Sequence, residues 1–376
     1  MKKYIFKRES GADLSLIIIV VILSLWGTLM IFSAGSAYAQ ARYDDSLYFI
    51  KKQIIWLISG YAVMIIASKI PPELYKRATP PLYIVTLCLL FLVLIVGFVG
   101  NGAKRWISVG PITIQPSEIA KITIIMMLAY YFSKYEDLAL SNKKVLAFKY
   151  GTVIPCLIFV FPIILVMLQK HLSCIIILGL IGLCMTVCAG VTLRYISFFC
   201  SLGIGGVVSL ALFTDYTKER ITVWQNPEAY KLTGGWQTLQ GLMAIGSGGL
   251  FGVGFGNSVM KHCYVSEPAN DMIFAILCEE TGLIGATVTI LLFAFLIFRG
   301  IRISLKSSDV FSRLVSFGIS AKMAIQTLLN IAVVTNTIPN TGISLPFFSY
   351  GGSSLLMIFF EMGVLLSISR KAKIIK

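Results

Sequence analysis

The feature that most constrains this chain is a series of apolar runs, each about as long as a membrane is thick. A transmembrane helix needs about 20 consecutive apolar residues, and a run of that length begins near Leu14 and recurs along the 376 residues. Charged residues make up only 13% of the chain and hydrophobic residues 57%. A soluble domain carries about 25% charged residues, so the composition excludes a soluble enzyme, a disordered protein and a secreted disulfide-stabilised domain. We expect an integral membrane protein.

The apolar runs predict an all-α polytopic membrane protein with about ten transmembrane helices. The spans are expected at residues 14–32, 53–69, 80–99, 116–133, 150–168, 172–190, 195–213, 271–298, 311–334 and 352–369. The first run is too long for a signal-peptide core and has no clear cleavage site, so we interpret it as a retained helix. Without an internal repeat or linker, residues 1–376 form one transmembrane domain, with one large extracytoplasmic loop, about 214–270, before span eight.

The net charge of +15 has two interpretations. Basic patches bind nucleic-acid phosphates, but lysine and arginine also gather on the cytoplasmic side of polytopic proteins. With the N-terminus inside, 20 of these residues fall on the cytoplasmic side and 10 on the outer side. The bias predicts cytoplasmic N- and C-termini and no nucleic-acid binding.

Metal-ligand patterns are sparse. The eight cysteines form no CxxC pair, and His171 and His262 are the only histidines. We therefore predict no histidine-based metal centre and no disulfide framework.

A glycine-rich segment, GSGGLFGVGFG at 246–256, lies in the large outer loop. A phosphate-binding G-x-G-x-x-G loop would need glycine at Phe251, and no G-K-[ST] follows. We therefore expect a re-entrant or tightly packed backbone against the membrane face.

Ionisable residues within the expected spans are few, and such residues are costly in a membrane unless they have a function or a partner. They are Glu118 and Lys121 in span four, Asp271, Glu279 and Glu280 in span eight, Lys322 in span nine and Glu361 in span ten.

Glu118 and Lys121 lie three residues apart, so they share one helix face. They form either an ion pair that only neutralises itself or part of a binding site. The preceding loop carries Lys104 and Arg105 on the side where cations are scarce. A cationic rim above a buried charge pair suits an anionic amphipathic ligand such as a lipid phosphate.

Asp271 opens the eighth span from the outside. An aspartate at a helix start can cap the free N–H groups, and an outward carboxylate can equally serve catalysis. The spacing alone does not separate these two interpretations.

Lys322 and Glu361 are expected to form a structural ion pair between spans nine and ten. Each lies near the middle of its span, where an isolated charge costs several kcal/mol. In the competing interpretation, Glu361 faces a polar cavity on the substrate path.

Four longer segments resemble one known family. They are GAKRWISVGPITIQPSEIAK (102–121), AIGSGGLFGVGFG (244–256), EPANDMIFAILCEETGLIG (267–285) and NTGISLPFFSYGGSSLL (340–356). In these motifs the whole chain resembles the SEDS family (FtsW, RodA and SpoVE), most closely the FtsW/SpoVE branch. At Lys170 and His171 the chain departs from the family's usual proline and frequent aspartate, and no role is transferred there.

The resemblance implies a peptidoglycan glycosyltransferase that polymerises lipid II at the outer face of the bacterial cytoplasmic membrane, in division or spore wall synthesis. It implies Asp271, Glu118 and Lys121 as catalytic residues. It also implies a class B penicillin-binding protein as transpeptidase partner, other division-machinery membrane proteins and membrane lipids as further partners, and a place at the division septum.

The chemistry of this reaction suggests a role for each residue. An α-linked donor that becomes a β-linked product requires inversion, for which one carboxylate base suffices, and Asp271 lies at a suitable depth. Lys121, Lys104 or Arg105 would compensate the leaving pyrophosphate, with Mg²⁺ or Mn²⁺ as a further candidate, while Glu118 holds Lys121. A lipid II flippase and a non-catalytic division scaffold are the alternatives.

Overall fold

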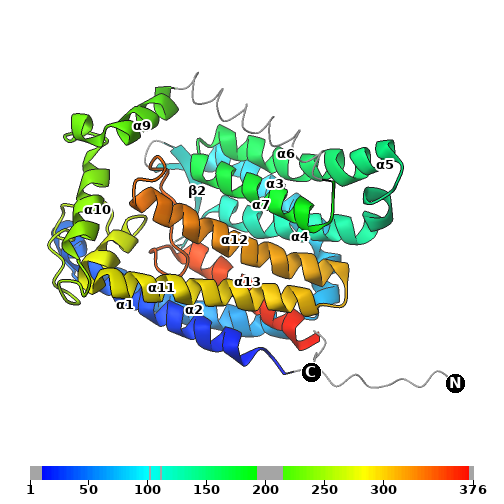
Figure 1. Ribbon diagram of the computed structural model, residues 1–376, viewed down its shortest axis with the longest axis horizontal. Coiled ribbons are helices and arrows are strands. Elements are labelled where there is room, and N and C mark those ends of the chain that lie inside the picture. The colour runs from blue at the N-terminus through cyan, green and yellow to red at the C-terminus, as the bar shows by residue number, and fades with distance from the viewer. Residues whose placement is uncertain (1–10, 101–102, 111, 193–214, 372–376) are drawn as a thin grey trace.

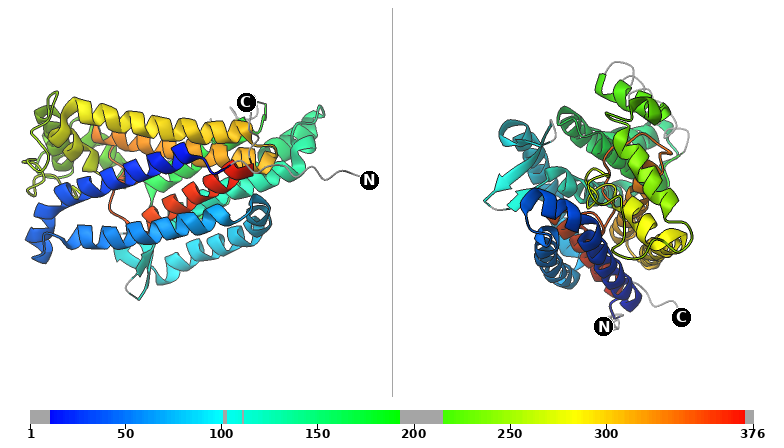
Figure 2. Two further views of the ribbon diagram at one scale, coloured as in Figure 1. Left: turned by 90° about the horizontal axis from the view of Figure 1, so that it is seen from below. Right: turned by 90° about the vertical axis from the view of Figure 1, so that its left-hand side faces the viewer.

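The fold is an elongated bundle of long helices (Figures 1 and 2). In this computed structural model, residues 11–100, 103–110, 112–192 and 215–371 are described. The first half of the described chain contains α1 (Leu14–Tyr43), α2 (Tyr48–Lys69), α3 (Pro72–Val96), α4 (Pro116–Ala139), α5 (Lys144–Phe148), a π-helical turn (Lys149–Val153), α6 (Ile154–Leu168) and α7 (Leu172–Cys188). The second half contains α9 (Asp215–Gln225), a 3-10 turn (Pro227–Tyr230), α10 (Trp236–Ser247), α11 (Ile273–Lys306), α12 (Val310–Val334) and α13 (Gly352–Lys371).

The predicted fold class is confirmed, because each expected span that falls on described residues coincides with a helix. The span expected at 195–213 lies outside the described residues. Within the described part of the chain, seven helices are long and apolar enough to cross a membrane. α7 has only 17 residues, and Glu118 and Lys121 lower the hydropathy of the 24-residue α4. The number of crossings therefore stays a prediction.

One local element differs from the all-helical expectation. The loop between α3 and α4 forms a small antiparallel sheet of β1 (Phe98–Gly100), β2 (Ala103–Val109) and β3 (Ile112–Ile114), which projects from the side of the bundle (Figure 2). β2 pairs with both neighbours. The chain turns between β2 and β3 at Gly110, whose φ of +62° suits glycine.

The two ends of the bundle differ in what they carry. At one end, Asp13 caps α1, and its carboxylate pairs with Arg299 near the end of α11. Lys371 at the end of α13 pairs with Glu73 at the start of α3, 2.6 Å between Nζ and Oε2. The opposite end carries the small sheet, α9, α10 and the 340–349 segment (Figure 1). By the predicted orientation this second end faces outward.

Small residues allow close helix packing in the core. Gly60 of α2 lies against the ring of Phe359 in α13, and Gly363 of α13 lies against Met64 and Ala67 of α2. In a lipid environment, helices associate through such close van der Waals packing. α2 and α13 therefore pack closely together, and α13 also contacts α4 and α12.

Candidate active site

The Glu118–Lys121 pair lies at the outer end of α4. Pro116 occupies the first turn of the helix, where its missing N–H costs nothing. One turn later, Lys121 Nζ lies 2.7 Å from Glu118 Oε2 and 2.8 Å from Oε1. Both side chains are buried. Lys121 Nζ also donates to Gln326 Oε1 of α12 at 3.4 Å, so the pair joins two helices.

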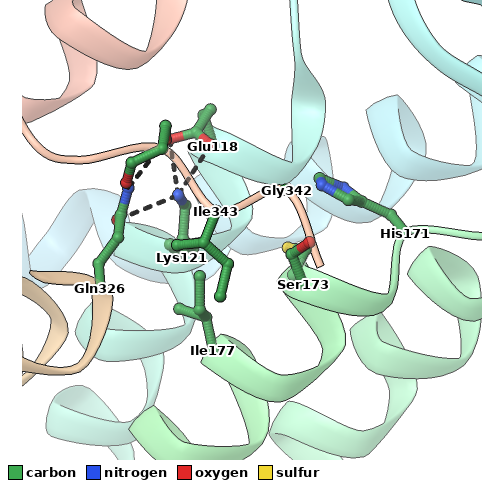
Figure 3. Close-up of a pocket in the computed structure, with 10 residues that line it drawn as sticks. Glu118, Lys121, His171, Ser173, Ile177, Gln326, Gly342 and Ile343 are labelled. Atoms are coloured by element: carbon green, nitrogen blue, oxygen red, sulfur yellow. Dashed lines mark hydrogen bonds and ion pairs between the residues drawn. The ribbon is translucent and has the colours of Figure 1, made fainter. Parts of the chain in front are cut away.

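The pair opens onto a small pocket (Figure 3). The pocket is lined by Glu118 and Lys121 of α4, by His171, Ser173, Cys174 and Ile177 at the start of α7, by Gln326 of α12, and by Gly342, Ile343 and Ser344. Burial and the nearby charge of Arg105 lower the pKa of His171 to about 3. Its ring is therefore neutral, and Lys121 supplies the cation of the pocket.

One wall of the pocket is the irregular segment 340–344, which side chains from two helices, α7 and α12, hold by its carbonyl groups. Gln326 donates to Ser344 O at 3.0 Å, and Asn330 donates to Ile343 O at 2.6 Å. Ser173 of α7 donates to Thr341 O. Irregular backbone at this depth needs such partners, because water is scarce.

Asp271 lies close to the same segment. A Cβ built at Gly342 would lie 3.6 Å from Asp271 Oδ2, and Asn330 donates to the backbone oxygen of Asp271 at 2.9 Å. Thus Asp271 and the Glu118–Lys121 pocket flank the same stretch of chain, which neither sequence spacing nor helix periodicity indicates.

The carboxylate of Asp271 feels the opposite charge of Arg220 but accepts only a weak side-chain hydrogen bond. Its nearest hydrogen-bond partner is Gln237 of α10, whose Nε2 lies 3.5 Å from both oxygens. Burial, followed by the charge of Glu267, raises the pKa of Asp271 to about 7. α11 begins after Met272, and no side chain caps it. The capping interpretation of Asp271 is therefore wrong, and the carboxylate is available to accept a proton near neutral pH.

Lys104 and Arg105 are adjacent in β2, so their side chains point to opposite faces of the strand. Lys104 is exposed. Arg105 donates to the backbone oxygen of Lys170, next to His171 of the pocket, and its buried Nε has no hydrogen-bond partner among the described residues. The sequence predicted a shared role for these two cations, but the geometry brings only Arg105 to the pocket.

The predicted Lys322–Glu361 pair is confirmed as an ion pair. Lys322 Nζ lies 3.0 Å and 2.9 Å from the two oxygens of Glu361, and both residues are fully buried. The competing interpretation, that Glu361 faces a polar cavity, finds no support within the described residues.

A further buried pair escaped the sequence analysis. Lys261 of the outer loop donates to Glu280 Oε1 at 3.0 Å and to Ser33 of α1 at 3.2 Å. The neighbouring Glu279 accepts from the backbone N–H of Val259 at 2.9 Å. The sequence did contain a signal. Glu279 and Glu280 have no lysine or arginine within one helix turn, so a buried pair of carboxylates at this place needs a partner from another segment.

Protein ligands for a metal are scarce. No cluster of three or more His, Cys, Asp or Glu side chains occurs within the described residues. Mg²⁺ or Mn²⁺ binds through one or two carboxylates together with substrate phosphates, so Asp271 is the carboxylate beside the pocket that would contribute to such a site.

The FTSW_RODA_SPOVE family model, described as "Cell cycle protein", matches residues 13–374. The chain belongs to this family. Stage V sporulation protein E of Bacillus subtilis (strain 168) is 40% identical, over 97% of this chain and 99% of its own length. Probable peptidoglycan glycosyltransferase FtsW of Geobacter sulfurreducens (strain DL-1 / KN400) is 36% identical, over 98% and 97%. The chain is thus a SEDS protein of the FtsW/SpoVE branch.

Solved structures share its fold. One, described as "Structural coordination of polymerization and crosslinking by a peptidoglycan synthase complex", has a TM-score of 0.80 at 23% identity and covers 96% of this chain and 98% of its own. Rod shape determining protein RodA of Thermus thermophilus has a TM-score of 0.70 at 24% identity and covers 96% and 97%. Together with the apolar helices, the family establishes a multi-pass membrane protein.

Proposed function

We propose that this chain is a peptidoglycan glycosyltransferase that polymerises lipid II into glycan strands at the outer face of the cytoplasmic membrane. The observation that carries the proposal is the position of Asp271, a carboxylate with a pKa of about 7, beside a pocket that contains a buried lysine–glutamate pair. The relatives named as peptidoglycan glycosyltransferases support the same activity.

In the proposed reaction, the 4-hydroxyl oxygen of an acceptor sugar attacks the anomeric carbon of a donor. The bond from that carbon to the pyrophosphate oxygen breaks, and the configuration inverts in one displacement. Asp271 accepts the hydroxyl proton as general base. A pKa near 7 leaves a large fraction of this carboxylate ionised at neutral pH and able to hold the proton.

The leaving group is a polyprenyl pyrophosphate, which gains negative charge as the bond breaks. Lys121 and Arg105 are the cations beside the pocket that would stabilise this charge. Glu118 holds the Lys121 ammonium in position. Arg105 has an unused buried N–H, and guanidinium groups bind phosphate oxygens in a fork.

The same residues bear on the alternatives. A flippase needs a polar path through the bilayer, yet the mid-depth pair Lys322–Glu361 is enclosed and self-satisfied. A scaffold needs no raised pKa at Asp271. We propose further that the chain works with a cross-linking class B penicillin-binding protein at the division septum or in spore wall synthesis, with both termini in the cytoplasm.

The decisive experiment uses purified protein in nanodiscs with fluorescent lipid II as substrate. We expect glycan strands on a gel with the parent and none with Asp271→Ala purified in parallel, which controls for contaminating polymerases. Transbilayer movement of labelled lipid without polymer would support the flippase. The absence of both activities, with folding intact, would support the scaffold.

A further inference from the structure

The glycine-rich segment of the outer loop forms backbone hydrogen bonds with α11. Val253 N donates to Glu279 O at 2.9 Å, and Gly254 N donates to Glu280 O at 3.1 Å. In the other direction, Leu283 N donates to Gly249 O at 2.9 Å. α11 is interrupted at this point, because Gly282 has φ 65° and ψ −167°. The loop therefore supplies the backbone partners that the broken turn lacks.

The contact is too close for side chains. A Cβ at Gly248 would clash with the carbonyl oxygen of Cys278, and one at Gly252 would clash with that of Glu280. The tightly packed backbone expected for residues 246–256 is thus confirmed, and close contact with α11 explains Gly248 and Gly252 without a phosphate ligand.

The depth of this contact follows from counting along α11. The Asp13–Arg299 ion pair marks the inner end of the apolar part of this helix, which continues to Lys306. Gly282 precedes Arg299 by 17 residues, which is about 25 Å at 1.5 Å per residue. The hydrocarbon core of a bilayer is about 30 Å thick, so the contact falls within the outer part of the core.

A second count on α1 agrees. The ring of Phe255 lies 6.5 Å from the ring of Trp26. Trp26 follows Asp13 by 13 residues, which is about 20 Å along the helix. Two different helices thus place the segment below the outer surface of the bilayer.

The apolar side chains of the segment are exposed on the surface of the protein. Leu250, Phe251, Val253 and Phe255 are exposed, Phe251 to 79%. They adjoin exposed apolar positions of α11 that begin at Leu283 and Ile284, directly beside the loop. A contiguous group of exposed apolar side chains marks an interaction surface.

We propose that residues 249–255 form a re-entrant segment in the outer leaflet, where these four apolar side chains contact lipid acyl chains. Irregular backbone survives at membrane depth only when its polar groups are satisfied by protein, and the bonds to α11 provide this for the segment. The occupant is a lipid because the patch continues the apolar surface of α11 at hydrocarbon depth. The segment thereby anchors the outer loop that carries Lys261.

The test is photo-crosslinking with the full-length chain purified into nanodiscs that contain radiolabelled acyl chains. The photoreactive residue benzoylphenylalanine replaces Phe251 in one variant. In the control it replaces Leu232, an 86% exposed apolar residue of the same outer loop that forms no bond to α11 in the described structure. We expect several-fold more labelled lipid adduct at position 251 than at position 232.

Equal lipid adducts at both positions would overturn the proposal, as would an adduct at 251 only with another protein when native membranes are used. A second measurement avoids the bulky probe. Phe251→Asp should lower the thermal stability in nanodiscs more than Leu232→Asp does, whereas Phe251→Leu should preserve it. Equal effects of the two aspartates would contradict a lipid environment at Phe251.

Discussion

Two buried lysine–glutamate pairs of the same composition reach α12 one helix turn apart, one at Gln326 and the other at Lys322, and they differ in what surrounds them. Glu118 and Lys121 belong to one helix, and the lysine shares its protons with Gln326 at the edge of a pocket. Lys322 and Glu361 join α12 to α13, and the lysine binds both carboxylate oxygens in full enclosure.

The difference separates two uses of the same chemistry. An enclosed pair that satisfies its own charges holds helices together and has no capacity left for a ligand. In a pair that opens onto a pocket, the lysine can replace one of its hydrogen bonds within the protein by a hydrogen bond to a substrate group. Residue type and burial alone do not distinguish the two pairs. The difference is that only the Glu118–Lys121 pair lines a pocket that a ligand could enter.

The largest effect is expected at Asp271, which lies close to Gly342 of the pocket that contains the open pair. Asp271→Asn keeps the shape but cannot accept a proton, so the polymerisation rate should fall about 100- to 10,000-fold. Rates with purified parent and variant check this. An Asn variant that retains more than about a tenth of the parent rate would remove Asp271 from the role of base.

The open pair should behave as one functional unit. Glu118→Ala, Lys121→Ala and the double variant are each expected to abolish polymerisation to a similar extent, because each leaves the other charge unpaired. A double-mutant cycle on rates measures the coupling. Losses that add up in the double variant would show independent roles.

The enclosed pair should affect stability. Lys322→Ala leaves Glu361 buried without a partner and should cost about 3–5 kcal/mol, measured as reduced stability in nanodiscs or detergent. The swap Lys322→Glu with Glu361→Lys should recover much of that stability and retain polymerisation. A swapped protein that is stable but inactive would contradict a purely structural pair.

The two cations of β2 should differ. Arg105→Ala removes the side chain beside the pocket and should raise the KM for lipid II several-fold, whereas Lys104→Ala, on the opposite face of the strand, should have a smaller effect. Membrane insertion of both variants serves as the control. Equal changes in KM would mean that strand geometry does not decide which cation binds.

The smallest effect concerns pH and stability. The pKa of Asp271 rises from 3.8 to about 7, so ionisation in the folded state is unfavourable, and its full cost is present above pH 7. Asp271→Asn should therefore have a higher Tm than the parent at about pH 8, and this advantage should shrink toward about pH 4. A Tm difference between variant and parent that grows as the pH falls would contradict a raised pKa of Asp271.

Sequence alone predicted the elements that depend on local composition. Apolar runs predicted the long helices, and counting residues from the span ends predicted that Lys322 and Glu361 would meet. The i, i+3 spacing predicted the Glu118–Lys121 pair. In each case the relevant distance is fixed by helix geometry or by the thickness of the bilayer.

The remaining features depend on contacts between distant segments. Asn330 and Gln326 hold the 340–344 segment, yet in the sequence they are ordinary polar residues of a span. Lys261 finds Glu280 only because the glycine-rich loop folds back on α11. The small sheet did leave a local signal, since short β-prone runs flank Gly110, but the loop was too short to suggest three strands.

The broken turn of α11 also has a consequence for the order of synthesis. Val253 and Gly249 bond to Glu279 and Leu283, which the ribosome adds 26 and 34 residues later. Until α11 has been inserted, the N–H and C=O groups of the glycine segment have no protein partners and must bond to water outside the hydrocarbon core. The segment therefore enters the membrane from the outside, after its partner helix, and the outer loop reaches its final position only in a late step of assembly.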